Sequence, residues 1–440
     1  MRELFVTLPD DPPPLPPGYL DTVLTRGRRA VRRQRVATAA AATIVVLLLA
    51  VLVLPGVPLP GQTAASSAKP SLPDRFAGYS MLTSTVAKAP PGRAIALYGY
   101  GNGETFNMFQ PLVVGADGDT YRRVDAMEER GGPSTLLAPD GTRVLLGDDR
   151  GATRDLILVD LTTGKRRSIP LGDPVGVRLL AWSPDGRHVA YSAAPIHHYD
   201  EYESVDGEVA RTGTLRLLDL STGRSTEVPA IKPAWTAAFA PDSRRLAVQV
   251  GQTAHLIDLD GSEYGTVPIQ DRRELAADVG WSPDGTFLAT VPWISEGPSN
   301  GGDTHHTFLY ELGDVEFVPL ADAGAPPTGV RGVARLLGWR SASSVLVAVF
   351  NDAGHAALVE VQLDTGTRQT LSRFDTGSTC ELGMQHCQIT DLHLATGLLP
   401  DLTVRSAGRP QRGPWPLLLD AVIAAVVLGA AFLVWRRTRP

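Results

Sequence analysis

The sequence predicts an all-β protein: a six-bladed β-propeller of four-stranded antiparallel blades, flanked by two transmembrane α-helices. Three observations lead to this fold class. A turn of the type Trp-Ser-Pro-Asp-Gly recurs about every 50 residues between β-rich runs. Two long runs carry almost no charge. The composition, with 43% hydrophobic and 20% charged residues among 440, excludes a collagen-like or wholly disordered chain.

The first apolar run covers residues 37–54 and contains no charged residue. Eighteen helical residues span about 27 Å, close to the hydrocarbon thickness of a bilayer. Six arginines between positions 26 and 35 precede the run, and a basic flank holds that end of a span in the cytoplasm. A cleaved signal peptide is the alternative. The 36 residues before the run and the length of the run favour an uncleaved anchor.

The second apolar run covers residues 417–435 and is bounded by Trp415 and Trp435. Tryptophan is typical of the membrane interface. Because the first span fixes the orientation, we expect a two-pass plasma-membrane protein with both termini in the cytoplasm. The net charge is −6 although the two cytoplasmic ends are basic, so the region between the spans is acidic. An acidic domain is an unsuitable partner for nucleic acid.

These runs divide the chain into seven parts. The predicted order is a cytoplasmic Pro-rich and Arg-rich tail at 1–36, a transmembrane helix at 37–54, a linker at 55–73, an extracytoplasmic propeller with a C-terminal Cys hairpin at 74–400, a linker at 401–416, a transmembrane helix at 417–435 and a cytoplasmic end at 436–440.

The recurring turn has a physical explanation. Proline fixes φ, the aspartate binds backbone amides of its own turn, and glycine accepts the left-handed conformation that follows. Clear copies lie at 182–186, 240–243 and 281–285, another at 138–141, and weaker ones at 89–93 and 339–343. We assign a structural role in these turns to Asp140, Trp182, Asp185, Asp242, Trp281 and Asp284. Six copies predict six blades. A seventh blade, built from 388–396 and the segment before Tyr79, is the alternative.

The Trp-Ser-Pro-Asp-Gly element at 182–186 and 281–285 resembles the repeats of TolB-type propellers, over roughly residues 75 to 375. The resemblance implies the propeller fold. Similar repeats occur in the propeller of prolyl-oligopeptidase-like enzymes, but this chain has no Gly-x-Ser-x-Gly motif for their hydrolase domain. Only four of the 41 basic residues are lysines. This bias is typical of a GC-rich genome, for example an actinobacterial one.

Two cysteines, Cys380 and Cys387, both fall in the predicted extracytoplasmic region. A close pair in an oxidising compartment predicts a disulfide. A zinc site that also uses His386 and His393 is the alternative.

Two insertions are expected to lie on one face of the ring, because chain reversal places all loops between second and third strands on the same side. They contain the weak metal-ligand candidates His197, His198, His305 and His306, and the candidate binding face Tyr199, Asp200, Glu201, Tyr202 and Asp303. Solvated loops explain these side chains without a metal, so we predict no metal and no cofactor. Enlarged loops on a rigid scaffold commonly carry recognition.

No catalytic set is apparent. The glycine-rich segment 99–103 lacks the Lys and Ser/Thr of a phosphate-binding loop, and a glycosidase pair is recognised only by a carboxyl separation that the sequence does not give. We therefore predict a non-enzymatic protein-binding, scaffold or sensing module, whose partner is an envelope protein or a cytoplasmic regulator. The alternatives are a transmembrane regulator that signals through its N-terminal tail and a polysaccharide hydrolase that uses carboxylates of the propeller.

Overall fold

The computed structural model describes residues 69–77, 80, 83–102, 108–124, 135–148, 151–196, 205–292, 313–320, 323–333, 335–350, 356–374, 388–414 and 429. The chain divides into two compact units, one of residues 65–414 and one of residues 1–64 with 415–440. Within the described part of the chain, no helix is both long and apolar enough to cross a membrane. The predicted spans at 37–54 and 417–435 lie outside the described residues, apart from Gly429.

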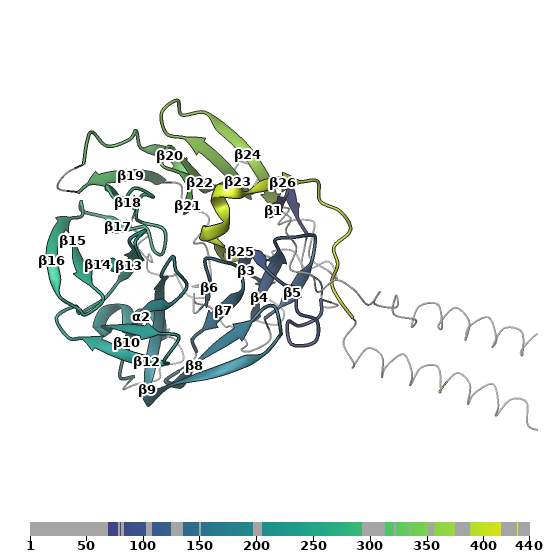
Figure 1. The fold of residues 1–440 in the computed structure, drawn as a ribbon, viewed down its shortest axis with the longest axis horizontal. Helices are drawn as coiled ribbons and strands as arrows, with labels where there is room; N and C mark the ends of the chain where they lie inside the picture. The colour runs from purple at the N-terminus through teal and green to yellow at the C-terminus, as the bar shows by residue number, and fades with distance from the viewer. Residues whose placement is uncertain are drawn as a thin grey trace, which may run out of the picture. The chain divides into compact units, whose positions relative to one another are not determined.

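The unit of residues 65–414 is a ring of β-sheets (Figure 1). One sheet has the order β25-β3-β4-β5. Its strands are β25 (Gln388–Leu394), β3 (Ala94–Asn102), β4 (Met108–Gly115) and β5 (Tyr121–Arg123). A seven-stranded sheet, β6 to β12, follows. Its strands are β6 (Thr135–Leu137), β7 (Arg143–Leu146), β8 (Thr153–Asp160), β9 (Arg166–Trp182), β10 (His188–Ala194), β11 (Thr214–Asp219) and β12 (Arg224–Val228).

Three further sheets complete the ring. The first holds β13 (Thr236–Phe239), β14 (Arg245–Val250), β15 (Thr253–Asp258) and β16 (Glu263–Pro268). The second holds β17 (Arg273–Leu275), β18 (Phe287–Pro292), β19 (Gly313–Pro319) and β20 (Val330–Val333). The third holds β21 (Arg335–Ser341), β22 (Ser344–Phe350), β23 (Ala356–Gln362) and β24 (Arg368–Phe374), with β2 (Arg75–Phe76) beside β24. The predicted all-β ring of antiparallel sheets is thus confirmed.

Strand β9 joins two four-stranded meanders into the seven-stranded sheet. Its first part, Arg166 to Pro170, pairs with β8, and its last part, Gly176 to Trp182, pairs with β10. One continuous strand therefore serves as the last strand of one meander and the first strand of the next.

The first strand of each meander lies toward the centre of the ring (Figure 1). Strand β6 contacts β9 and β25, β13 contacts β9 and β17, and β21 contacts β25. Apolar side chains fill the space between neighbouring meanders. For example, Leu180, Ala237 and Ile257 come from three different strands and belong to one buried cluster. A meander has two apolar faces, so each one requires a neighbour on both sides.

The ring is closed by a strand from near the C-terminal end of the unit. Strand β25 pairs with β3 and becomes the first strand of that sheet. The alternative of a seventh blade made from 388–396 and the segment before Tyr79 is therefore wrong: β25 completes an existing sheet, while β2 extends another one. The two ends of the unit also meet, because β1 (Ser71–Pro73) pairs in parallel with β26 (Thr403–Arg405). The 3-10 helix η2 (Thr396–Asp401) connects β25 to β26.

The turn copies occupy equivalent places. Five of them connect the first and the second strand of a meander. The weak copy at 89–93 precedes β3, which is the second strand of its sheet; the first strand of that sheet is β25. Gly141 ends one copy with φ +71°, and a Cβ there would lie 2.1 Å from the carbonyl oxygen of Ala94. The amide of Ala94 also donates to the carbonyl of Gly141 over 2.7 Å. Glycine at this position therefore permits the close approach of two neighbouring meanders.

The described part of the insertion between β10 and β11 contains the helix α2 (Val205–Thr212). Val205 and Val209 pack with Ala194 in a small separate core. The solvated loop predicted for this insertion thus includes a helix over Val205–Thr212, which was not predicted. Its apolar face secures the end of the insertion against β9 and β10.

Candidate functional site

The six turn residues singled out in the sequence lie where a first strand passes into the second strand of its meander. They do not form one site, since they belong to four different meanders (Asp140, Trp182, Asp185, Asp242, Trp281 and Asp284). In one turn, Asp185 Oδ1 accepts hydrogen bonds from Ser183 Oγ at 2.6 Å and from the amide of Arg187 at 2.9 Å. Ser282 and Thr286 repeat this pattern around Asp284.

Two of these turns lower the pKa of their aspartates, Asp242 and Asp284. Burial acts against ionisation at Asp284, but hydrogen bonds from Ser282 and Thr286 outweigh it and keep the pKa of Asp284 below its ordinary value. The pKa of Asp219, in a turn between third and fourth strands, is also lowered, by the hydroxyl of Ser221 and then by Arg187. A carboxylate that accepts hydrogen bonds from its own turn is a structural element.

The tryptophans of the turns connect neighbouring meanders. The indole Nε1 of Trp281 donates to the carbonyl of Ala238 over 2.8 Å, and that of Trp339 donates to the carbonyl of Val279 over 3.0 Å. The guanidinium of Arg245 lies 5.7 Å from the centre of the Trp281 ring, within range of a cation–π contact.

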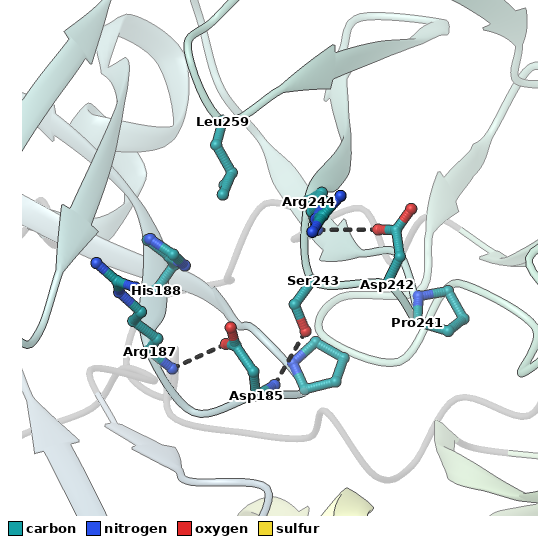
Figure 2. Close-up of a pocket in the computed structure, with 9 residues that line it drawn as sticks. Asp185, Arg187, His188, Pro241, Asp242, Ser243, Arg244 and Leu259 are labelled. Carbon is teal, nitrogen blue, oxygen red and sulfur yellow. Dashed lines mark hydrogen bonds between the residues drawn. The ribbon is translucent and has the colours of Figure 1, made fainter.

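A hollow opens between two of these turns (Figure 2). It has a volume of about 670 Å³ and lies where the 182–186 turn approaches the 240–243 turn. The amide of Asp185 donates to Ser243 Oγ over 3.0 Å and bridges the two turns. Arg187, His188, Arg244 and Leu259 contribute side chains to its walls.

A second group of polar side chains lies on the first strands, toward the centre of the ring. It comes from five meanders and is called the axial cluster: Arg178 of β9, Trp235 just before β13, Glu274 of β17, Asp278 just after it, Arg335 of β21 and His393 of β25. Sequence reasoning noticed only His393, and assigned it as an alternative ligand beside the cysteines.

Glu274 is bound on one side by tryptophan and faced by two arginines. The Nε1 of Trp235 donates to Glu274 Oε2 over 2.8 Å, and the guanidinium of Arg178 covers the Trp235 ring at 4.8 Å from its centre. Burial raises the pKa of Glu274, while Trp235, Arg178 and Arg335 partly offset this effect. The residue keeps a partly exposed surface, so its carboxyl group is enclosed by protein yet within reach of solvent.

Asp278 is held by a neighbouring meander. The amide of Trp182, 96 positions earlier, donates to Asp278 Oδ1 over 2.8 Å. The backbone of Asp278 has φ +64°, a left-handed conformation that aspartate tolerates better than most residues. Burial raises the pKa of Asp278, and His393 and Arg335 act in the opposite direction. Arg335 therefore influences both acids of the cluster.

Gln249 fixes the strand that carries Glu274. Its Oε1 accepts the amide of Leu275 at 2.6 Å, and its Nε2 donates to the carbonyls of Arg273 at 3.2 Å and Gly251 at 2.8 Å. These bonds hold the residues on both sides of Glu274. Gln249 is itself buried, so its side chain is a fixed positioning element for the cluster.

Most of the other predicted site residues lie outside the described part of the chain. This holds for the cysteine pair, the four insertion histidines and the candidate binding face (Cys380, Cys387, His197, His198, His305, His306, Tyr199, Asp200, Glu201, Tyr202 and Asp303). Among the residues that the structure describes, no group of three or more His, Cys, Asp or Glu side chains is arranged to hold a metal ion.

A sequence signal for the axial cluster does exist. Arg178, Trp235 and Arg335 each stand four positions before the aromatic residue with which a turn begins, namely Trp182, Phe239 and Trp339. Position within the repeat thus predicts that these three side chains face the centre, but it does not predict Glu274 or Asp278.

Comparisons with known proteins give fold-level similarities. No protein-family model matches the chain, and no curated protein matches it significantly. Among solved structures, TolB from Acinetobacter baumannii is 15% identical over 69% of this chain and 67% of that chain, with a TM-score of 0.42. An oligogalacturonate lyase in complex with manganese is 15% identical over 70% and 80%, with a TM-score of 0.40. A putative TolB from Agrobacterium tumefaciens is 14% identical over 68% and 99%, with a TM-score of 0.38. The ring of sheets is assigned from the strand order of this chain and not from these similarities.

Proposed function

We propose that this chain is a non-enzymatic, membrane-anchored, extracytoplasmic propeller that binds or senses a partner at the centre of its ring. The observation that carries the proposal is the axial cluster. It gathers two carboxyl groups, two guanidinium groups, an imidazole and an indole from strands far apart in sequence. Charged groups are costly to bury, and perturbed carboxyl groups occur preferentially at functional sites.

The proposed ring has six blades. The six turn copies precede six second strands, and the seven-stranded sheet counts as two blades that share β9. A rigid ring of this kind presents the first strands of its blades around one axis, which suits a binding site that draws on several blades at once.

The meeting of the two ends supports the proposed anchoring. Thr403 donates its amide to the carbonyl of Pro70 over 2.9 Å. Arg405 donates to Asp119 Oδ1 at 3.0 Å and to the carbonyl of Gly118 at 2.8 Å. The two ends of the described unit thus lie on adjacent strands, β1 and β26, which suits two neighbouring anchors.

Localisation is testable with tags at both ends and protease added to intact cells. The propeller should be cleaved and the tags protected.

The test of function is crosslinking in cells followed by identification of partners. Four forms are compared: the full-length protein, the Glu274→Gln/Asp278→Asn double variant, a form lacking residues 1–24, and a Gln252→Leu control at an exposed position of β14–β15. An envelope partner captured by the wild type and the control but lost from the double variant supports binding at the axial cluster. A partner lost only without residues 1–24 supports the regulator alternative. Equal capture by all four forms contradicts the axial site.

A hydrolase that uses the cluster is the second candidate, and one observation favours it. Burial raises the pKa of both Glu274 and Asp278, and a carboxyl group with a raised pKa is suited to act as a general acid. This candidate predicts that the full-length protein cleaves cell-wall polysaccharide and that Glu274→Gln or Asp278→Asn abolishes cleavage. Cleavage that both variants retain would exclude the cluster as its source.

A further inference from the structure

The hollow between the 182–186 and 240–243 turns carries hydrogen-bond donors without partners. Arg244 is exposed, and its side chain has no hydrogen-bond or ion-pair partner among the described residues. Arg187 bonds Asp219 through one guanidinium nitrogen at 3.2 Å and keeps its other N–H groups. The two arginines lie on opposite sides of the hollow (Figure 2).

His188 adds a third donor to the wall. Its Nδ1 is buried and has no hydrogen-bond partner in the described part of the chain. A proton on Nδ1 would therefore be a buried donor without an acceptor, which is costly. Nε2 is the other ring nitrogen, and in the tautomer that protonates it the N–H group can donate to a ligand.

The acceptors of the same walls are largely occupied. Asp242 Oδ1 accepts the amides of Arg244 at 2.9 Å and Arg245 at 3.2 Å, and its Oδ2 accepts Arg245 Nε at 2.7 Å. Asp185 Oδ1 is bound by Ser183 and the amide of Arg187, so Asp185 Oδ2 is the principal remaining acceptor. Unused donors thus outnumber unused acceptors, and the hollow suits a ligand that is rich in acceptor oxygens.

The remaining wall is apolar. Pro184, Pro241 and Leu259 line the hollow, and Leu259 points into it (Figure 2). A volume of about 670 Å³ lies within the range of small-molecule sites, roughly 300–1,000 Å³. It exceeds what a bare ion needs.

We propose that this hollow is a second binding site, separate from the axial cluster, for a small organic anion: a carboxylate or phosphate carried on a ring-sized, partly apolar group. Arg244, Arg187 and His188 donate to the oxyanion, and the prolines and Leu259 contact the ring. Guanidinium groups match both carboxylate and phosphate oxygens.

The test measures binding of one ring with different charges by isothermal titration calorimetry on the full-length protein in detergent. The probes are phenyl phosphate, benzoate, benzyl alcohol and benzylamine, with inorganic phosphate in a separate titration. At least one of the two ring anions should bind about tenfold or more tightly than benzyl alcohol, and benzylamine should bind no better than the alcohol. Phenyl phosphate and benzoate together tell which oxyanion the site prefers. Inorganic phosphate that binds as tightly as phenyl phosphate would overturn the role of the apolar wall.

Variants locate the site. Arg244→Gln removes only an exposed side chain, so the fold is retained, and it should weaken anion binding about tenfold or more. Arg244→Lys keeps the charge but not the planar fork, and should lie in between. Arg224→Gln, at an exposed arginine that does not line the hollow, should change affinity less than about twofold. Equal effects of Arg244→Gln and Arg224→Gln would overturn the proposal.

The axial cluster offers an independent control. Glu274→Gln removes a charge from the cluster and should leave binding of the anion unchanged, because Glu274 is not part of the hollow. Loss of anion binding in Glu274→Gln would place the anion at the axial cluster and contradict a separate site. Failure of the anion to bind the wild type overturns this inference and leaves the axial proposal untouched.

Discussion

The turn aspartates and the axial carboxyl groups differ in where their hydrogen-bond donors come from. Asp185 is bound by residues two positions away in its own turn, whereas Asp278 is bound by the amide of Trp182, 96 positions away in another meander. The pKa of the turn residue Asp284 is lowered, and the pKa of Asp278 is raised. The same side chain thus stabilises a local turn in one region and depends on the closed ring in the other.

This difference has an energetic consequence. When the carboxylate of an exposed turn is removed, water can accept the hydrogen bonds that the turn amides donated to it. Each turn aspartate therefore contributes modestly to the free energy of unfolding. A donor enclosed by protein has no such replacement, and an unsatisfied buried donor costs about 1–3 kcal/mol. Substitutions at the axis should therefore cost more than substitutions in the turns, and their effects should spread over several meanders.

The largest effect is expected for Asp278→Ala. The change leaves the amide of Trp182 without its acceptor, removes a carboxyl group near Arg335, and places alanine at a left-handed φ. We expect a loss of about 3 kcal/mol in the free energy of unfolding, measured by urea denaturation of the full-length protein with tryptophan fluorescence.

The matched variant is Asp278→Asn. Asparagine keeps an acceptor for the Trp182 amide and tolerates the left-handed conformation, so its cost should stay within about 1 kcal/mol. Equal losses for Ala and Asn would mean that the charge of Asp278, and not its hydrogen bond, holds the two meanders together.

Gln249→Leu should have the next largest effect. Leucine has a similar size but cannot accept the buried amide of Leu275 or donate to the carbonyl of Arg273. A loss of about 2 kcal/mol is expected in the same urea experiment. Gln252→Leu is the control, because the Gln252 side chain makes an exposed bond to Asp271 at 2.8 Å and its loss should cost less than about 0.5 kcal/mol. Similar losses at both glutamines would remove the distinction between buried and exposed bonds.

The same contrast explains what the sequence could predict. Turn chemistry depends on residues that are consecutive, so Pro, Asp and Gly at 184–186 identify a turn and its place in a meander. Repetition of that turn then predicts the ring of sheets. The register that makes β25 part of the first sheet depends on pairing across nearly 300 positions, and the pattern of residues around β25 carries no local record of it.

The axial cluster could be predicted only in part. Arg178, Trp235 and Arg335 share a position in the repeat, so their direction toward the centre follows from the period. Asp278 does not share it. Its role depends on a positive φ and on the amide of Trp182, both of which arise from tertiary packing. The predicted binding face and the cysteine pair lie outside the described residues and stay predictions.

A smaller effect is expected for Ser183→Ala in a turn. Ser183 Oγ donates to Asp185 Oδ1 at 2.6 Å and accepts the amide of His188 at 2.8 Å. Ser183 is buried, so we expect a loss of about 1 kcal/mol. Ser282→Ala, in the equivalent turn, should match it. Ser221→Ala removes an exposed bond to Asp219 at 2.6 Å and should cost less than about 0.5 kcal/mol. If Ser183→Ala lowered the free energy of unfolding as much as Asp278→Ala, the turns would contribute as much to stability as the axial cluster, which contradicts the comparison.

The last difference is one of sign and is seen in the pH dependence of stability. A carboxyl group whose pKa is raised on folding binds its proton more tightly in the folded protein, so stability falls as pH rises from the unfolded pKa, near 4, through the folded pKa. Glu274 and Asp278 belong to this class. The free energy of unfolding of the wild type minus that of Glu274→Gln/Asp278→Asn should therefore decrease as pH rises above about 4, with Arg178, Arg335 and His393 present in both proteins. Asp219 has a lowered pKa, so its stabilisation is present above pH 4 and is lost as pH falls. The free energy of unfolding of the wild type minus that of Asp219→Asn should accordingly increase as pH rises toward 4 and stay level at higher pH. Two curves with slopes of the same sign would contradict the division of these carboxyl groups into two classes.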